Sequence, residues 1–251
     1  DLFKRLENLR LLILRENLLS EIPKAILETP TITNLDLSSN RLNGDSLVCL
    51  KEMKSLVSLN LTSNQIEHLP NELATLTNLQ SLILSTNNLT RFEPVIFQLP
   101  KLRELDMCFN KIDNVPSEIK RLGNLHCLIM TGNSLTEISP DIHKCRSLKS
   151  LDIRGNLLQD LTCLYKCDHL VDLRADYNHI NSIDNPNWPK MVELSVSNNN
   201  MCKVEFDHKM LHLRILDLSG NRIGLLPDGF FTFSPNVEYV NLNENQLTAL
   251  P

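Results

Sequence analysis

Two histidines have a spacing that could hold a metal ion. His208 and His212 are four residues apart, with Asp207 beside the first, and on a helix this spacing places both imidazoles on one face. Zinc requires at least three converging protein ligands, and the sequence of this region is accounted for without a metal. We therefore expect no metal site here.

A second candidate for chemistry is the cysteine pair Cys163 and Cys167 in the segment CLYKC. Its spacing differs from the C-x-x-C of redox and zinc sites. Cys167 stands where equivalent segments carry Leu76 and Leu122, so we expect a small buried hydrophobic residue at this position.

The seven cysteines are odd in number and scattered along the chain. This distribution favours reduced thiols and a cytosolic address, because secreted proteins of this size range usually pair their cysteines. Two N-glycosylation sequons, Asn60-Leu61-Thr62 and Asn88-Leu89-Thr90, would have meaning only in a secreted chain.

Composition and motifs exclude several classes of function. The patterns G-x-S-x-G, G-x-G-x-x-G, G-x-x-x-x-G-K-[ST] and H-E-x-x-H are all absent, so we expect neither catalytic turnover nor a cofactor. The formal net charge of −5 provides no basic face for a phosphate backbone, which argues against nucleic acid as a partner. There is no run of 18 apolar residues, so no transmembrane segment is expected, and the charged first residues do not resemble a signal peptide.

Self-similarity dominates the sequence. The pattern L-x-x-L-x-L-x-x-N-x-L recurs eleven times at a period of 21 to 24 residues. Its asparagines are Asn17, Asn40, Asn64, Asn87, Asn110, Asn133, Asn156, Asn178, Asn199, Asn221 and Asn245.

Each repeat begins with a short strand that ends in a sharp turn. In LDLSSN, Leu35 and Leu37 should point inward while Asp36 and Ser38 point outward, because side chains alternate along a strand. A buried Asn side chain after the strand can bond to backbone groups that the turn leaves unpaired. We therefore predict that the eleven asparagines form a structural ladder.

The part of each repeat that follows the turn should form the face opposite the strands. Leu69-Pro70 and Val115-Pro116 are followed by helical spacing, and proline is tolerated in the first turn of a helix, so short helices are expected there. The segment 184–189 contains two prolines and should be extended. Neither end of the sequence resembles a cap, which predicts that the native protein continues in both directions.

These observations together predict an α/β fold, a leucine-rich-repeat solenoid over residues 1–251. The expected shape is a curved horseshoe of about eleven repeats, with a parallel sheet on the concave face and short helices and extended segments on the convex face.

The concave face is the predicted partner-binding surface, because its side chains do not fill the core. Two features rise above a background of small polar residues. One is an apolar patch, and the other is a charged cluster with an aromatic residue. The apolar patch consists of Ile83, Phe109 and Ile129. The charged cluster consists of Arg154, Arg174, Asp176 and Tyr177. Aromatic residues and Arg are enriched at binding hot spots, so we expect a protein partner here.

The NxLxxLP variant of the repeat, in NQIEHLPNELATLTNLQSL (64–82) and NKIDNVPSEIKRLGNLHCL (110–128), resembles the intracellular leucine-rich-repeat class associated with Ras-type signalling. Residues 170–206 and 226–251 resemble the repeat region of fungal adenylate cyclases. In that family the repeats precede a protein-phosphatase-2C-like domain and a cyclase domain, and they bind GTP-loaded Ras. The leucine-rich-repeat protein phosphatases related to protein phosphatase 2C are the alternative resemblance.

The resemblance implies a regulatory repeat region that binds a Ras-family small GTPase through its concave face. Arg154 and Arg174 would then meet the acidic effector loop, and Phe109 and Tyr177 would supply the apolar contact. The location would be cytoplasmic, with recruitment to the plasma membrane only through the partner. A structural spacer between flanking domains is the non-binding alternative.

Overall fold

The structure is a computed structural model that describes residues 6–250, and it divides into two compact units. The first unit comprises the chain up to Ile112 together with Arg121–Cys127. The second comprises Asp113–Lys120 and the chain from Leu128 onward. Both units are built from the same repeat, so the same physical account of strand, turn and helix applies to each.

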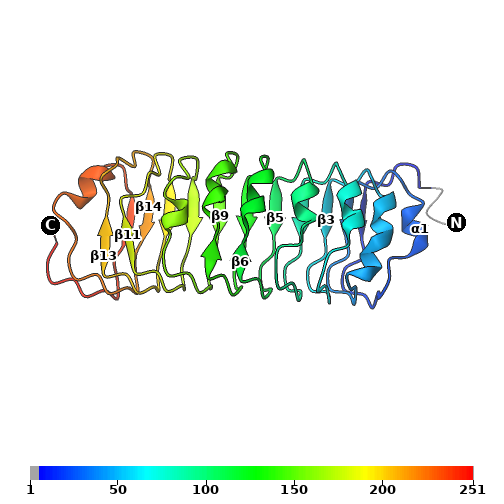
Figure 1. The fold of residues 1–251 in the computed structure, drawn as a ribbon, viewed down its shortest axis with the longest axis horizontal. Coiled ribbons are helices and arrows are strands. Elements are labelled where there is room, and N and C mark those ends of the chain that lie inside the picture. Colours follow the sequence, from blue (N-terminus) through cyan, green and yellow to red (C-terminus); the bar gives the residue numbers. More distant parts are fainter. Residues whose placement is uncertain (1–5, 251) are drawn as a thin grey trace. The chain divides into compact units, whose positions relative to one another are not determined.

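The first unit contains five short parallel strands, one in each repeat. They are β1 (Leu11–Ile13), β2 (Asn34–Asp36), β3 (Ser58–Asn60), β4 (Ser81–Ile83) and β5 (Glu104–Asp106), and they pair in this order (Figure 1). The central leucine of each strand lies in register with that of the next, as Leu35 does with Leu59. Both of these leucines are buried and their neighbours Asp36 and Asn60 point outward, as the alternation predicts.

The second unit repeats this arrangement. Its parallel strands are β9 (Ser150–Asp152), β10 (Asp172–Arg174), β12 (Glu193–Ser195), β14 (Ile215–Asp217) and β15 (Tyr239–Asn241). Strand β7 (Cys127–Ile129) begins with the last residue of the first unit and continues into the second. Over residues 6–250 each of the eleven predicted repeats therefore has its strand, which confirms the leucine-rich-repeat fold.

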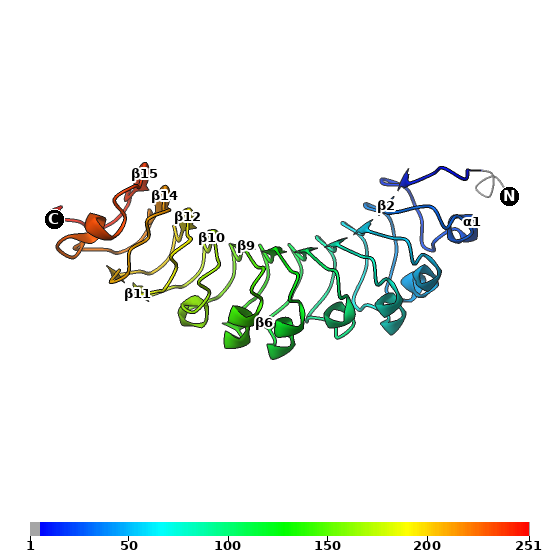
Figure 2. The same ribbon diagram turned by 90° about the horizontal axis from the view of Figure 1, so that it is seen from above.

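Short helices occupy the opposite face of the repeats in each unit, as Figure 2 shows. They are α1 (Lys24–Leu27) and the 3-10 helices η2 (Asp45–Glu52), η3 (Asn71–Thr75), η4 (Ile96–Gln98), η5 (Ser117–Arg121), η6 (Pro140–Lys144), η7 (Thr162–Leu164) and η8 (Phe230–Phe233). Pro70 directly precedes η3 and Pro116 directly precedes η5, as predicted. Each helix is short because a repeat leaves only a few residues between its turn and the next strand.

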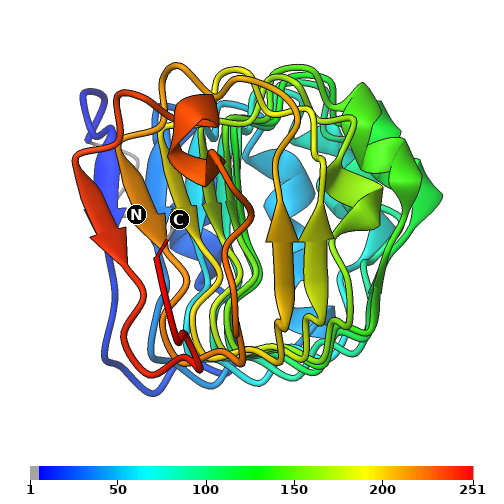
Figure 3. The same cartoon turned by 90° about the vertical axis from the view of Figure 1, so that its left-hand side faces the viewer.

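Two-residue and three-residue strands replace or accompany the helices in the second unit. Strand β6 (Asn114–Val115) pairs with β8 (Glu137–Ile138), and β11 (Ser182–Asp184) pairs with β13 (Lys203–Glu205), both in parallel. Seen from the end of the chain, β11 and β13 lie across the repeat from β14 and β15 (Figure 3). Residues 185–188 form no helix, but the prediction of an extended segment over 184–189 is only partly right, because Asn185 is left-handed with a φ of 56° and Pro189 lies in a turn. Instead the fully buried Trp188 fills this side of the repeat, and its Nε1 donates to Leu164 O at 2.9 Å.

The repeat asparagines make a recurring set of hydrogen bonds. Asn110 Nδ2 donates to the carbonyl oxygens of Leu84 (3.0 Å), Met107 (3.1 Å) and Cys108 (3.1 Å), and its Oδ1 accepts from Leu89 N at 3.0 Å. Seven further positions share this pattern and are buried, namely Asn40, Asn64, Asn87, Asn156, Asn178, Asn199 and Asn221. Asn17 is exposed, and Asn133 and Asn245 are half-buried. A buried asparagine thus pairs backbone groups of two successive repeats.

Candidate protein-binding surface

A left-handed residue precedes the ladder asparagine in all eleven repeats. The φ angles lie between 51° and 67° at Glu16, Ser39, Ser63, Thr86, Phe109, Gly132, Gly155, Tyr177, Asn198, Gly220 and Glu244. This conformation makes the sharp turn after each strand and brings the following Asn side chain inward. Three repeats use glycine, which has no Cβ and therefore adopts positive φ without a steric penalty. We call the outward side chains of the strands and of these turns the sheet face.

Phe109 and Tyr177 are the two aromatic residues at this turn position. Phe109 has a φ of 51° and Tyr177 a φ of 56°, and their exposed fractions are 60% and 64%. A left-handed conformation costs an L-residue about 1–2 kcal/mol. These rings recover little of that cost by burial. The conformation itself belongs to every repeat, so it is the exposure of the two rings that qualifies them as candidate contacts for a partner.

The three predicted apolar residues are divided between the two units. Ile83, on β4, and Phe109 belong to the first unit, whereas Ile129, on β7, belongs to the second. Ile83 and Ile129 are half-buried and Phe109 is exposed. The structure therefore brings only Ile83 and Phe109 into one unit, and Phe109 is the more accessible of the two.

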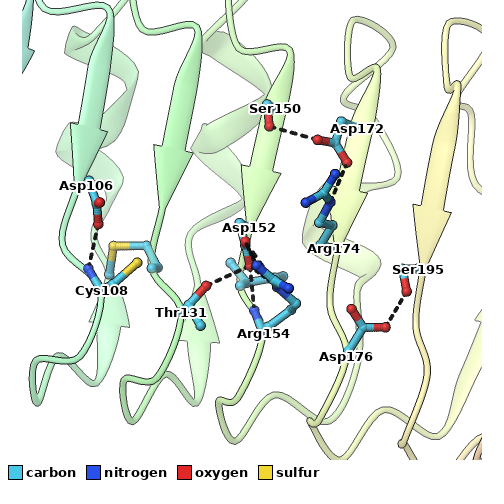
Figure 4. A network of polar contacts seen from close by, with 12 residues as sticks. Asp106, Cys108, Thr131, Ser150, Asp152, Arg154, Asp172, Arg174, Asp176 and Ser195 are labelled. Carbon is cyan, nitrogen blue, oxygen red and sulfur yellow. Dashed lines mark hydrogen bonds and ion pairs between the residues drawn. The ribbon is translucent and has the colours of Figure 1, made fainter. Parts of the chain in front are cut away.

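Arg154, in the second unit, is held by a carboxylate of its own repeat (Figure 4). Its Nη2 lies 2.6 Å from Asp152 Oδ2 and its Nε 2.9 Å from Oδ1. Asp152 also accepts from Thr131 Oγ1 at 2.8 Å and from the backbone N–H of Arg154 at 3.2 Å. Burial alone favours the neutral form of this carboxyl group, but the hydrogen bonds from Arg154 and Thr131 outweigh it and lower the pKa of Asp152.

Arg174 lies between two carboxylates. Its Nε is 3.3 Å from Asp172 Oδ1 on its own strand, and its Nη2 is 3.2 Å from Glu193 Oε1 on the neighbouring strand β12. Burial, together with repulsion from Glu193, raises the pKa of Asp172 although Arg174 opposes the shift. Arg174 Nε and Asp172 Oδ1 are close enough for an ion pair, but they are not aligned for a hydrogen bond. Over residues 6–250 neither atom has a hydrogen-bond partner.

Asp176 departs from the expectation of an accessible partner contact. It is 7% exposed, and its carboxylate accepts from the Ser195 hydroxyl (Figure 4). It also accepts from the Ser197 backbone N–H at 2.8 Å. Both donors belong to the next repeat, so this carboxylate stabilises the turn instead of facing solvent. The neighbouring Tyr177 is the accessible residue of this turn.

Glu193 belongs to the charged cluster, although the sequence pattern did not identify it as a member. The register of the parallel sheet places Asp172 opposite Glu193, and it thereby brings Glu193 next to Arg174. In the second unit the sheet face carries more carboxylates than arginines, because its strands carry Asp152, Asp172, Glu193 and Asp217 and the arginines are Arg154 and Arg174. This face can recognise a protein through aromatic and polar contacts, and its arginines are already paired.

The histidine and cysteine candidates of the sequence form neither a metal-binding group nor a disulfide in the part of the chain that the structure describes. No group of three His, Cys, Asp or Glu side chains there could hold a metal ion. His208 and His212 are not on a helix, and the ring of His208 contacts Asp207. All seven cysteines are free, and burial raises the pKa of Cys145 to about 11 and of Cys163 and Cys167 to about 12, so these thiols are poor nucleophiles. Cys167 is fully buried, as predicted.

The comparison with known families agrees with this architecture. Models described as "Leucine rich repeat" match residues 30–89, 77–135 and 212–251, and a further leucine-rich-repeat model matches residues 144–161. These segments cover more than half of the chain, which belongs to the leucine-rich-repeat family. No helix in residues 6–250 is long and apolar enough to cross a membrane.

The chain is similar in sequence to parts of longer proteins. It is 39% identical over 92 residues to human epiphycan, covering 36% of this chain and 27% of epiphycan. It is also 39% identical over 106 residues to the mouse volume-regulated anion channel subunit LRRC8B, covering 40% of this chain and 13% of that subunit.

Solved structures extend the similarity to the whole chain. A leucine-rich-repeat protein of Leptospira interrogans aligns with 99% of this chain and 70% of its own, with a TM-score of 0.81 and 29% identity. The structure of PEPR1–AtPEP1 aligns with 95% of this chain and 35% of its own, with a TM-score of 0.74 and 25% identity.

Proposed function

We propose that the sheet face is the protein-binding surface of a cytoplasmic signalling protein, and that this chain acts by binding and not by catalysis. The observation that carries the proposal is that Phe109 and Tyr177 each place an aromatic ring, more than half exposed, at a turn position that the other nine repeats fill with non-aromatic residues. Three other repeats have glycine at this position, so an aromatic side chain is not needed for the turn itself. Aromatic residues of this kind are typical anchors of protein interfaces.

Two further observations support a binding role. Asp172 Oδ1 and Arg174 Nε face each other as an ion pair at 3.3 Å on this face, but over residues 6–250 neither atom makes a hydrogen bond, which is uncommon for buried polar atoms. A bound polypeptide could supply the missing hydrogen bonds. PEPR1, whose fold this chain shares, has been solved together with AtPEP1.

For the partner, we propose a Ras-family GTPase in its GTP-bound form, with this chain as the regulatory repeat region of an adenylate cyclase. The support is the resemblance of residues 170–206 and 226–251 to fungal adenylate cyclases. Arg154 and Arg174 would exchange their present carboxylates for those of the GTPase. Because such an exchange replaces one ion pair with another, the free energy of binding should come mainly from Phe109 and Tyr177.

Nucleotide-dependent capture tests this proposal. The purified chain is immobilised and exposed to a purified Ras-family GTPase loaded either with a GTP analogue or with GDP. The proposal expects retention of the GTP-analogue form and little retention of the GDP form. Equal retention of both forms, or of neither, would remove the GTPase from the account.

A further inference from the structure

A second surface of the second unit has a different charge from the sheet face. The loops that lead into β9, β10 and β12 enclose a surface hollow of about 730 Å³. Four cationic side chains line it, namely Lys144, Arg146, Lys166 and Lys190, together with His143 and His169. Asp168 is the only carboxylate of its lining. Three successive repeats thus contribute positive charge to one place in a chain whose net charge is −5.

Most of this positive charge is uncompensated. Lys144 Nζ lies 2.7 Å from Asp141 Oδ1, and Lys120 shares the same carboxylate at 2.9 Å. Over residues 6–250 no ion pair involves Arg146, Lys166 or Lys190. On the sheet face, by contrast, the arginines are paired with carboxylates. Like charges gathered without counterions repel one another, so the hollow favours an anion.

His169 gives independent evidence for a ligand in the hollow. Its side chain is 91% buried, and its Nδ1 lies 3.2 Å from Asp168 Oδ1. Because a carboxylate accepts hydrogen bonds, Nδ1 carries the proton of the neutral ring. The other nitrogen, Nε2, is buried and has no hydrogen-bond partner among residues 6–250. Nε2 is then an acceptor, and a hydroxyl group of a partly protonated phosphate in the hollow could donate to it.

The geometry points to a small anion that carries several phosphate groups. We propose that this hollow binds such a ligand, with Arg146 as a fork-shaped donor and Lys166 and Lys190 as point charges from adjacent repeats. A volume of 730 Å³ far exceeds the roughly 30 Å³ share of one water molecule, so the hollow has room for more than one phosphate group. The site lies outside the sheet face and does not depend on the function proposed there.

Calorimetric titration with inorganic tripolyphosphate tests the proposal. Binding is expected at concentrations below about 1 mM, with an affinity that falls as salt is added. The variant Lys166→Glu/Lys190→Glu should weaken binding by at least about tenfold. The variant Lys54→Glu/Lys209→Glu changes the net charge equally at two exposed positions that do not line the hollow, and it should bind like the parent chain. Absence of binding by the parent chain, or equal loss in both variants, would overturn the proposal.

Two further measurements do not depend on how well the variants fold. Tripolyphosphate should raise the melting temperature of the parent chain, and it should move the ¹⁵N resonance of His169 Nε2 more than that of His208. An unmoved His169 resonance would count against the site. Vesicles of phosphatidylcholine with and without phosphatidylinositol bisphosphate distinguish the source of the phosphate groups. Capture only by the phosphoinositide vesicles would assign a lipid headgroup, whereas binding of tripolyphosphate without vesicle capture would assign a soluble anion.

Discussion

Arg154 lies against Asp152 on the sheet face, with Nη2 2.6 Å from Oδ2 and Nε 2.9 Å from Oδ1. Two parallel contacts of this kind form the strongest geometry available to an arginine and a carboxylate. Asp152 is nearly buried, so this pair stabilises the turn that follows β9 as well as fixing the side chain of Arg154.

Removal of Arg154 should therefore destabilise the chain. Arg154→Ala leaves the Asp152 carboxylate without its main counter-charge and should cost about 1–2 kcal/mol in the free energy of unfolding, measured by urea denaturation at pH 7. Arg15→Ala removes an exposed contact with Glu16 and should cost less than about 0.5 kcal/mol. Equal costs for the two variants would mean that the Asp152 pair has no special stability.

The asparagine ladder predicts a larger loss at a buried rung than at an exposed one. Asn110→Ala leaves the N–H of Leu89 and three carbonyl groups without their partner, so it should cost at least about 1–3 kcal/mol. Asn17→Ala is the matched control, because Asn17 is exposed and water can replace its side chain. Thermal unfolding of the two variants measures the difference, and an unchanged melting temperature for Asn110→Ala would contradict the ladder.

The left-handed turn position predicts opposite effects for two kinds of substitution. Gly155 has a φ of 62°, and an added Cβ would meet only ordinary contacts, at 3.6 Å from Gly132 N. Gly155→Ala should therefore lower stability through conformation alone, by about 1–2 kcal/mol. Tyr177→Asn should leave stability unchanged or raise it, because Asn tolerates this conformation and Asn198 already adopts it. Urea denaturation compares the two, and a large loss for Tyr177→Asn would show that the ring supports the fold.

The fold was predictable because the repeat imposes one rule on every coil. The alternation of Leu35 with Asp36 and the recurrence of the asparagines define strands, register and turns without any long-range information. The burial of Trp188 in place of a helix was harder to predict from the sequence. Two prolines predict an extended segment, but they do not predict which side chain fills the space beside it.

The candidate site was predictable only in part. Phe109 and Tyr177 follow from the outward pattern, whereas their left-handed backbone becomes evident only when the turn is compared across all repeats. The burial of Asp176 depends on two donors in the next repeat, Ser195 and Ser197. Because these residues are about twenty positions away along the chain, the sequence pattern does not reveal the contact. The contact of Glu193 with Arg174 likewise depends on the register of β10 and β12.

Lowering the pH below about 4 should remove the stability that the ion pairs of Asp141 with Lys144 and Lys120 contribute. Hydrogen bonds from Lys144 and then Lys120 lower the pKa of Asp141 to about 2. Since the folded pKa lies below the ordinary value of about 3.9, this group stabilises the folded state above pH 4, and the contribution is lost as the pH falls toward 2. Asp141→Asn should therefore reduce stability at pH 7, with a deficit that shrinks below pH 4. A deficit independent of pH would assign it to packing instead of charge.

The most direct test of a binding role for the sheet face is calorimetric titration of the chain with a GTP-analogue-loaded Ras-family GTPase. Tyr177→Asn and Phe109→Asn should each weaken binding by at least about tenfold, which corresponds to about 1.4 kcal/mol. Thr86→Asn changes the same left-handed turn position without removing a ring, and it should bind like the parent chain. Undiminished affinity of both ring-deleted variants would contradict the claim that these aromatic residues anchor a partner.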